Sequence, residues 1–240
     1  MSRRRTPPQP LPMEPFFRSL PGCHGILQAI AEEPDDDLHR LILADWLDDH
    51  GYSLRAEFIR LSLQIAQTPE DSPEWSGLQA QWKKWIHRSD EQEQWWDIRS
   101  QLVPGVELLY ERGMLEVAEM PATRFTIVAA TLYKRVDCRK LILLDALECL
   151  WLGRPELAYL DTLILPGGHI SNICHLSLEC KYLSNLKNLH IWLDEVEDFP
   201  LLELQQLLRS RYLRECKIYY GDHQTETEVL LSCVGSARDI

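Results

Sequence analysis

The stretch from Pro34 to Gln67, PDDDLHRLILADWLDDHGYSLRAEFIRLSLQIAQ, carries the clearest fold signal in the chain. Asp35, Asp36 and Asp37 precede an apolar-periodic run. Carboxylates at such a place accept hydrogen bonds from the free amides of a first helical turn and match the positive end of its dipole. Gly51 can take the left-handed conformation that ends a helix. The stretch therefore predicts two helices that are separated at Gly51.

The two helices differ in how their apolar residues are arranged. Ser53 fits the N-cap of the second helix, whose apolar residues form one narrow stripe: Leu54, Phe58, Leu61 and Ile65. The first helix is apolar nearly all round, and at about 100° per residue Asp45 falls inside its apolar arc. Because unpaired burial of a carboxylate is costly, we expect Asp45 to pair with Arg55, Arg60 or the amide end of the second helix.

The aspartates also allow a catalytic alternative, a metal-dependent hydrolase or nuclease that uses Asp35–Asp37, Asp45 and His39 or His50. Such chemistry needs carboxylates that converge on a metal or substrate, whereas three consecutive residues point in different directions. The chain has no Gly-rich phosphate loop, nucleophile elbow, HExxH or CxxC to support it. We therefore predict no enzyme activity, no catalytic residue, no metal and no cofactor. The motif residues are read as structural: Asp35, Asp36, Asp37, Asp45, Trp46, Arg55 and Arg60.

The stretch resembles the bacterial repeat-companion domain, a small helical module that often precedes leucine-rich-type repeats. The matching positions are Pro34, Asp35, Asp36, Asp37, Arg40, Leu41, Ala44, Asp45, Trp46, Leu47, Gly51, Arg55, Ala56, Glu57, Phe58, Ile59, Arg60 and Leu61. Arg112, Gly113 and Glu116 resemble the family's RGF(V/L)E segment, with Met114 in place of the aromatic residue. The resemblance implies a helical domain followed by repeats, and it brings no catalytic residue.

Composition limits the partners. The chain of 240 residues has 25 Lys and Arg against 37 Asp and Glu, a net charge of −12. This charge argues against direct nucleic-acid binding or an anionic membrane, which need clustered basic residues. No apolar run approaches the roughly 20 residues of a membrane span. We expect the partner to be another protein, whose identity the sequence does not encode.

Seven cysteines are scattered without a CxxC pair, and several fall in apolar patterns. A reduced cysteine there acts as a small apolar residue, so we expect a reducing, cytoplasmic location. A zinc site would be drawn from His169, Cys174, His175 and Cys180. Its spacings fit no common zinc pattern, so we do not predict one.

Residues 1–22 hold four Arg and six Pro and predict a disordered tail. Residues 23–104 predict a helical repeat-companion domain, with helices near 25–33, after residue 74 and over 90–102. Pro104 and Gly105 mark its end. Residues 105–240 predict a leucine-rich-repeat-like domain, so the expected fold is α/β: helices followed by a short solenoid with a parallel sheet of about five strands.

The repeat prediction depends on apolar pairs separated by one residue. The pairs are Leu115/Val117, Leu141/Leu143, Leu163/Leu165, Leu189/Ile191 and Cys216/Ile218. Their first members are 26, 22, 26 and 27 residues apart, which matches the leucine-rich period of a strand followed by a helix. The expected helices lie within 122–134, 147–159, 170–184, 198–210 and 224–234.

The neighbours of these pairs point to the other, concave face of the sheet, because side chains alternate along a strand. One expected row is Glu116, Ile142, Ile164, His190 and Lys217; the next contains Leu144, Trp192 and Tyr219. We predict that a partner protein binds to Ile142, Leu144, Ile164, His190, Trp192, Lys217 and Tyr219. Alternatively, the N-terminal helices or the tail cover this strip. The chain is thus expected to be a protein–protein interaction or scaffold protein, or a subunit of a larger complex.

Overall fold

The structure is a computed structural model of the chain and describes residues 15–18, 20–86, 103–146, 149–166, 181–193, 213, 216–222 and 227–232. These residues belong to two compact units. The helical unit holds the described residues up to 86 together with Tyr110–Leu115 and Arg135–Asp137. The sheet unit holds the other described residues.

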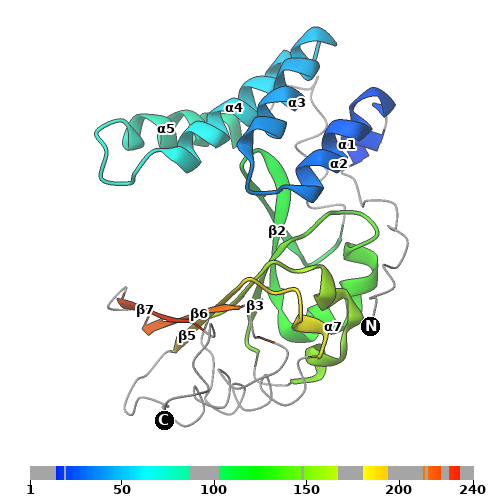
Figure 1. Ribbon diagram of the computed structural model, residues 1–240, viewed down its shortest axis with the longest axis vertical. Coiled ribbons are helices and arrows are strands. Elements are labelled where there is room, and N and C mark those ends of the chain that lie inside the picture. Colours follow the sequence, from blue (N-terminus) through cyan, green and yellow to red (C-terminus); the bar gives the residue numbers. More distant parts are fainter. Residues whose placement is uncertain are drawn as a thin grey trace. The chain divides into compact units, whose positions relative to one another are not determined.

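The helical unit is built from short helices that pack in chain order (Figure 1). They are α1 (Pro15–Arg18), η1 (Pro21–Cys23, a 3-10 turn), α2 (His24–Glu32), α3 (Asp37–Asp49), α4 (Ser53–Gln67) and α5 (Trp75–Ile86). Helices α3 and α4 pack against each other, α2 packs on α3, and α5 packs on α4. Asp36 accepts a 2.9 Å hydrogen bond from the amide of Leu38, and Gly51 has a φ of +84°. The predicted cap of α3 and the predicted helix end at Gly51 are therefore confirmed. Ser53 is not the N-cap of α4 as predicted, because it is the first residue of that helix and Tyr52 holds the cap position.

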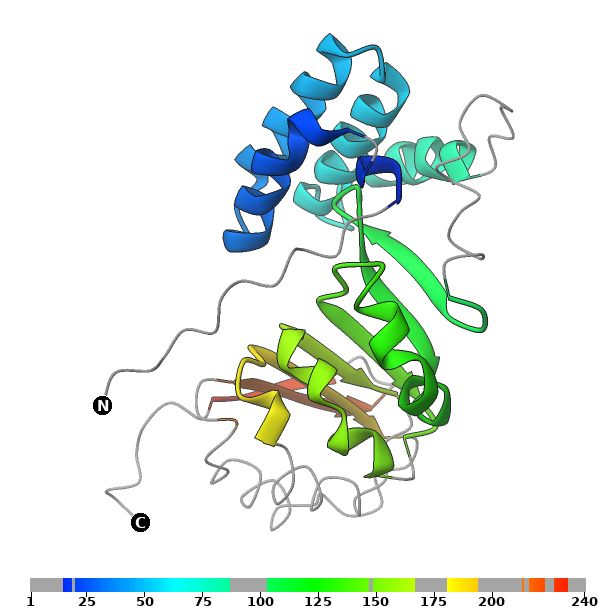
Figure 2. The ribbon, with the colours of Figure 1, turned by 90° about the vertical axis from the view of Figure 1, so that its right-hand side faces the viewer.

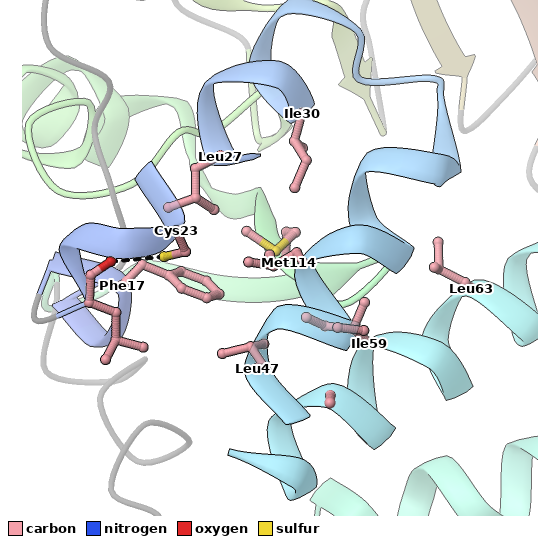
Figure 3. Close-up of a cluster of buried hydrophobic side chains, with 12 residues drawn as sticks. Phe17, Cys23, Leu27, Ile30, Leu47, Ile59, Leu63 and Met114 are labelled. Carbon is pink, nitrogen blue, oxygen red and sulfur yellow. Dashed lines mark hydrogen bonds between the residues drawn. The ribbon is translucent and has the colours of Figure 1, made fainter. Parts of the chain in front are cut away.

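The core of the helical unit gathers apolar side chains from α1 to α4 and from one strand (Figure 3). Leu27, Leu47, Ile59, Leu63 and Met114 belong to it. Phe17 of α1 is also buried, so ordered structure begins within the stretch predicted to be a tail through residue 22. The thiol of Cys23 donates to the carbonyl of Leu20 at 3.0 Å, and burial raises the pKa of Cys23 to about 11. Cys23 thus acts as an apolar core residue.

Strands β1 (Glu107–Glu111) and β2 (Met114–Pro121) are neighbours in the sheet and are joined by Arg112 and Gly113. Such a short connection joins adjacent strands only as an antiparallel hairpin. Arg112 and Gly113 have φ values of 47° and 84°, as a primed hairpin turn requires. A Cβ atom at Gly113 would lie 2.7 Å from the Cα atom of Ile59. Only glycine therefore fits this turn.

The sheet has seven strands in the order β1 to β7. After β2 come β3 (Lys140–Leu144), β4 (Thr162–Leu165), β5 (Asn188–Leu193), β6 (Lys217–Asp222) and β7 (Thr227–Ser232). Strands β2 to β6 are parallel, and β7 is antiparallel to β6. The chain is thus a mixed α/β protein in which N-terminal helices precede a mostly parallel sheet, as predicted.

One face of the sheet is covered by helix α7 (Ala122–Leu132) and by three 3-10 turns (Figure 2). The turns are η2 (Cys149–Gly153), η3 (Pro155–Tyr159) and η4 (Lys181–Leu183). The strands direct alternate residues toward this layer, and the apolar pairs of β3, β4 and β5 are fully buried: Leu141, Leu143, Leu163, Leu165, Leu189 and Ile191. The predicted inward pairs of these three strands are confirmed.

Two helix predictions in this unit are wrong. The helix expected over 147–159 is replaced by η2 and η3. A 3-10 turn rises about 2.0 Å per residue against about 1.5 Å in an α-helix, so it returns the chain to the next strand in fewer residues. The helix expected over 224–234 is replaced by β7, which pairs with the otherwise open edge of β6.

Some predictions lie outside the described residues. They are the helices over 90–102 and 198–210 and the group His169, Cys174, His175 and Cys180; of the helix over 170–184, only Lys181–Leu183 is described. In the part of the chain that is described, no helix combines the length and apolar character needed to cross a membrane.

A charged ladder joins the segments that precede β3, β4 and β5. The amide of Asp161 donates to the carbonyl of Arg139 at 2.9 Å, and the amide of Lys187 donates to that of Asp161 at 2.8 Å. The side chains alternate in sign and pair in the same order: Arg139 Nη1 lies 3.2 Å from Asp161 Oδ2, and Lys187 Nζ lies 3.7 Å from it. These contacts satisfy backbone groups just before three neighbouring strands.

Candidate protein-binding surface

The face of the sheet opposite α7 carries one continuous row of side chains across four strands. Strand pairing places Ile142 beside Ile164, Ile164 beside His190, and His190 beside Tyr219. Adjacent strands lie about 4.8 Å apart, so the row extends over roughly 14 Å. All four side chains are partly exposed. Ile142, Ile164 and His190 alternate with buried core residues, so the sheet holds this part of the row in a fixed geometry.

Three rings stack at the β5–β6 end of this row. The rings of His190 and Tyr219 are nearly parallel, at 7°, with centroids 4.4 Å apart. Trp192 lies two residues along β5 and stacks on His190 at 6.3 Å. Stacked aromatic side chains offer a large, rigid contact area at low cost in conformational entropy.

We call Ile142, Leu144, Ile164, His190, Trp192 and Tyr219 the sheet patch. Its composition is apolar and aromatic, with an imidazole that can donate or accept a hydrogen bond. Fixed aromatic side chains within an apolar surround are the usual energetic centre of a protein–protein interface. This arrangement suits binding of a partner's apolar side chains.

The register differs from the prediction at both ends of the sheet. In β2, Ala118 and Met120 pair with Leu141 and Leu143, so Glu119 rather than Glu116 continues the patch row. In β6 the pairing is displaced by two residues from the predicted register. Each side chain therefore stays on its predicted face of the sheet, but Tyr219 rather than Lys217 lies beside His190.

The structure also corrects the predicted neighbours of Lys217 and Leu144. Lys217 pairs with Asn188 and is exposed, so it lies at the start of β6 and not in the patch row. Leu144 and Trp192 belong to β3 and β5, with β4 between them, so they are not side by side as expected. The aromatic cluster consists of His190, Trp192 and Tyr219.

The aspartates of the opening motif do not converge. Asp36 caps α3, whereas Asp37 receives a 3.0 Å hydrogen bond from Gln67 and lies 3.4 Å from Arg112. Asp35 is exposed. Asp45 pairs with Arg60 at 2.7 Å, which is one of the predicted partners. Its side chain is 75% exposed, however, so the predicted burial of Asp45 is wrong.

Arg60 also binds Asp48, a contact that the sequence reading missed. Arg60 Nη1 lies 2.6 Å from Asp48 Oδ2. The hydrogen bond from Arg60, and to a smaller extent one from Ser53, holds the pKa of Asp48 below its ordinary value. In turn, hydrogen bonds to Asp45 and Asp48 raise the pKa of Arg60. Asp48 precedes Arg60 by twelve residues across the α3–α4 turn, so no helical spacing connects them.

The buried charges of the motif are arginines. Arg55 is 1% exposed, and its guanidinium carbon lies 5.4, 5.3 and 5.1 Å from the ring centroids of Phe17, Phe58 and Tyr110. Arg40 is also 1% exposed and donates to the carbonyl of Pro34 at 2.5 Å.

Trp46 is partly buried and stacks on His50, with ring centroids 3.9 Å apart. These contacts of Arg40, Arg55 and Trp46 stabilise the helical unit.

Glu33, Asp36 and His39 are the one group among the described residues whose metal-binding atoms gather, within 4.8 Å of one another. Asp36 is occupied as the helix cap, and His39 Nε2 lies 3.1 Å from Glu33 Oε2. Glu33 and Asp36 are exposed. Capping and one surface pair account for this arrangement.

Comparison of the chain with protein-family models, curated proteins and solved structures finds no significant match. The class defined by the fold is a mixed α/β protein with N-terminal helices and a mostly parallel sheet. We therefore infer the function from the chain's own residues and their geometry.

Proposed function

We propose that this protein is a non-catalytic interaction or scaffold protein that holds another protein on the sheet patch, by itself or as a subunit of a complex. The observation that carries the proposal is the stacked group His190, Trp192 and Tyr219, in register with Ile142 and Ile164. Partly exposed apolar and aromatic side chains, held on a rigid sheet, resemble a binding hot spot.

We further propose a leucine-rich-repeat-like architecture that follows a repeat-companion helical domain. Three features support it. Leu141, Leu163 and Leu189 are paired in register at repeat-like spacing. Short 3-10 turns lie on the buried side of the sheet. The ladder at Arg139, Asp161 and Lys187 recurs with the same period. In such proteins the sheet face is the usual binding face.

The hydrolase alternative has less support. Asp36, Asp37 and Asp45 each contact a different partner, so they do not form one metal or substrate site. If a metal-dependent activity exists, Asp36→Ala should abolish it together with stoichiometric metal binding. We expect neither a bound metal nor an activity in purified protein.

A cytoplasmic location is also part of the proposal. Cys23, Cys138 and Cys216 are buried. Thiols that are kept reduced and used as apolar core residues are typical of a reducing compartment.

The test compares capture of partners from the native host by tagged wild type and by Trp192→Ala. As an aromatic anchor, Trp192 should contribute about 2 kcal/mol or more to affinity, which is roughly a 30-fold loss when it is truncated. The thermal midpoint should change little. The matched control is Tyr159→Ala, because Tyr159 is an exposed aromatic residue on η3, and this variant should retain the partner.

A second variant tests the register. Leu189 is fully buried beneath the patch, so Leu189→Ala should destabilise the sheet unit by about 2–5 kcal/mol. If Trp192→Ala unfolds the protein while Leu189→Ala is silent, the assignment of faces is wrong. If Trp192→Ala folds and every captured partner still binds, the sheet patch is not the interface.

A further inference from the structure

The outer face of α3 carries large apolar side chains that the fold does not bury. Leu38, Leu41 and Ile42 are 56%, 39% and 43% exposed. At about 100° per residue they lie on one face together with Asp45 and Asp49. Arg40, Leu43, Ala44 and Leu47 form the opposite face and are buried. Helix α3 therefore has one apolar face in the core and a second apolar face in solvent.

This clustering is unusual within the described residues. The other large exposed apolar side chains are Tyr52, Ile127, Leu150 and Tyr159, which come from separate elements. Single exposed apolar residues are normal on a protein surface, whereas a contiguous group marks an interaction site. Leu38, Leu41 and Ile42 lie within five residues of one helix, so this face needs a functional explanation.

The charges around the face are acidic at both ends. Asp35 and Asp36 are exposed at the amino end, where Asp36 also caps the helix. At the carboxyl end Asp49 is exposed, and so is Asp45, whose Oδ1 pairs with Arg60 of α4. The last turn of α3 contains no basic residue. Carboxylates at a helix carboxyl end oppose its dipole and so destabilise the helix. Helix stability therefore does not explain Asp49, whereas a basic partner would.

We propose that the outer face of α3, formed by Leu38, Leu41, Ile42, Asp45 and Asp49, docks an amphipathic helix of a partner protein with basic residues flanking its apolar stripe. The face runs from Leu38 to Asp49, eleven residue steps or about 16 Å at 1.5 Å per step, which matches three turns of a partner helix. Ridges of apolar side chains on two helices interlock, and Lys or Arg would pair with the acidic ends.

Charge disfavours two other occupants of this face, a second copy of the chain and an anionic membrane. Two copies of this face would bring acidic ends together in either helix orientation, and like charges repel. An anionic membrane would be repelled by the same aspartates, because interfacial helices attract such lipids through basic residues. A basic amphipathic helix alone complements both the apolar stripe and the charges.

The experiment titrates the full chain into a fluorescein-labelled 18-residue peptide of Leu and Lys. Its Leu residues recur at i, i+3, i+4 and i+7, and binding is followed by fluorescence anisotropy. The double variant Leu41→Ser/Ile42→Ser should weaken binding at least tenfold. Ile127→Ser, which alters an exposed apolar residue of α7, should change the affinity less than twofold.

Two matched variants test the contribution of charge to binding. Asp49→Asn should weaken binding about threefold and lower its salt dependence. Asp71→Asn removes a carboxylate from the exposed loop after α4 and should do neither. Equal losses in the two variants, or equal binding of a scrambled peptide of the same composition, would mean that bulk charge alone attracts the peptide and would overturn the proposal.

Hydrogen exchange of the wild type gives a readout that needs no substitution. The peptide should protect amides of Asp37–Asp49, and protection confined to other segments would refute the site. Two more results would overturn the proposal. One is a concentration-dependent dimer that Leu41→Ser/Ile42→Ser removes. The other is wild-type cosedimentation with phosphatidylglycerol vesicles that this double variant loses.

Discussion

At the scale of single residues, conformational constraint and burial separate positions that look alike in the sequence. Asp45 and Arg55 both belong to the opening motif, yet Asp45 is exposed and Arg55 is enclosed by three rings. Exposed ion pairs contribute about 0–1 kcal/mol, so we expect Asp45 to contribute little to the free energy of folding. That role belongs to Arg55 and Arg40, whose burial makes their truncation costly.

Gly113 provides a residue-level prediction with an internal control. Gly113 and Gly51 both have a φ of +84°, but a Cβ atom at Gly51 meets nothing within 4 Å. Gly51→Ala should therefore cost only the left-handed strain of about 1–2 kcal/mol. Gly113→Ala adds a clash with the Ile59 backbone and should cost about 2–4 kcal/mol in total. Urea unfolding measures both, and equal losses would show that the hairpin does not pack on Ile59.

At the scale of elements, the pair between α3 and α4 predicts a pH dependence. The folded pKa of Asp48 lies below its ordinary value of 3.8, chiefly because Arg60 donates a hydrogen bond to it. The stabilisation is thus present above pH 3.8 and is lost as the pH falls through the lower, folded pKa.

Asp48→Asn should accordingly lower the urea midpoint at pH 7, and the difference from wild type should shrink below pH 3.8. Asp71→Asn is the control and should leave the midpoint unchanged at both pH values. A difference that stays constant with pH would show that the loss arises from packing and not from the ion pair.

Elements with a single apolar periodicity could be predicted from the sequence. The apolar pairs of β3, β4 and β5 recur at repeat-like spacing, so the faces and register of these strands were predictable. Helix α4 was predicted only in part, because Ala56, Ile59 and Leu63 are buried outside the predicted stripe. Helix α3 has two apolar faces, and no pattern tells which one packs inward; Asp45 was misplaced for this reason.

The sheet ends were ambiguous for similar reasons. In β2 four apolar residues are all buried: Leu115, Val117, Ala118 and Met120. Either Leu115/Val117 or Ala118/Met120 could therefore be the pair that aligns with the inward pair of β3. In β6, apolar residues continue at every second position, and a shift by two preserves the pattern. The pairing of Ile164 with His190 in the candidate site was predictable from the sequence. The position of Tyr219 beside His190 was not predictable.

At the scale of the molecule, strands β1 and β2 each contribute residues to both units. Met114 and Leu115 of β2 belong to the helical unit, and Glu116–Pro121 belong to the sheet unit. Met114 packs in the core with Phe17 and Ile59. A strand of the sheet therefore completes the helical core.

This sharing predicts where a core substitution acts. Met114→Ala should destabilise the helical unit by about 2–4 kcal/mol and accelerate amide exchange in α2, α3 and α4. Leu163→Ala, in the middle of the sheet, should accelerate exchange in β3, β4 and β5. If Met114→Ala alters only the sheet amides, the division of β2 between the units is wrong.

The late position of Met114 also has a consequence in time during synthesis. Leu63, the last residue of α4 in the helical core, leaves the ribosome 51 residues before Met114. At about 5–20 residues per second, the first helices wait roughly 3–10 s for the side chain that closes their core. The N-terminal part of this chain therefore cannot finish folding as it emerges, and its apolar surface is open to chaperones during that interval.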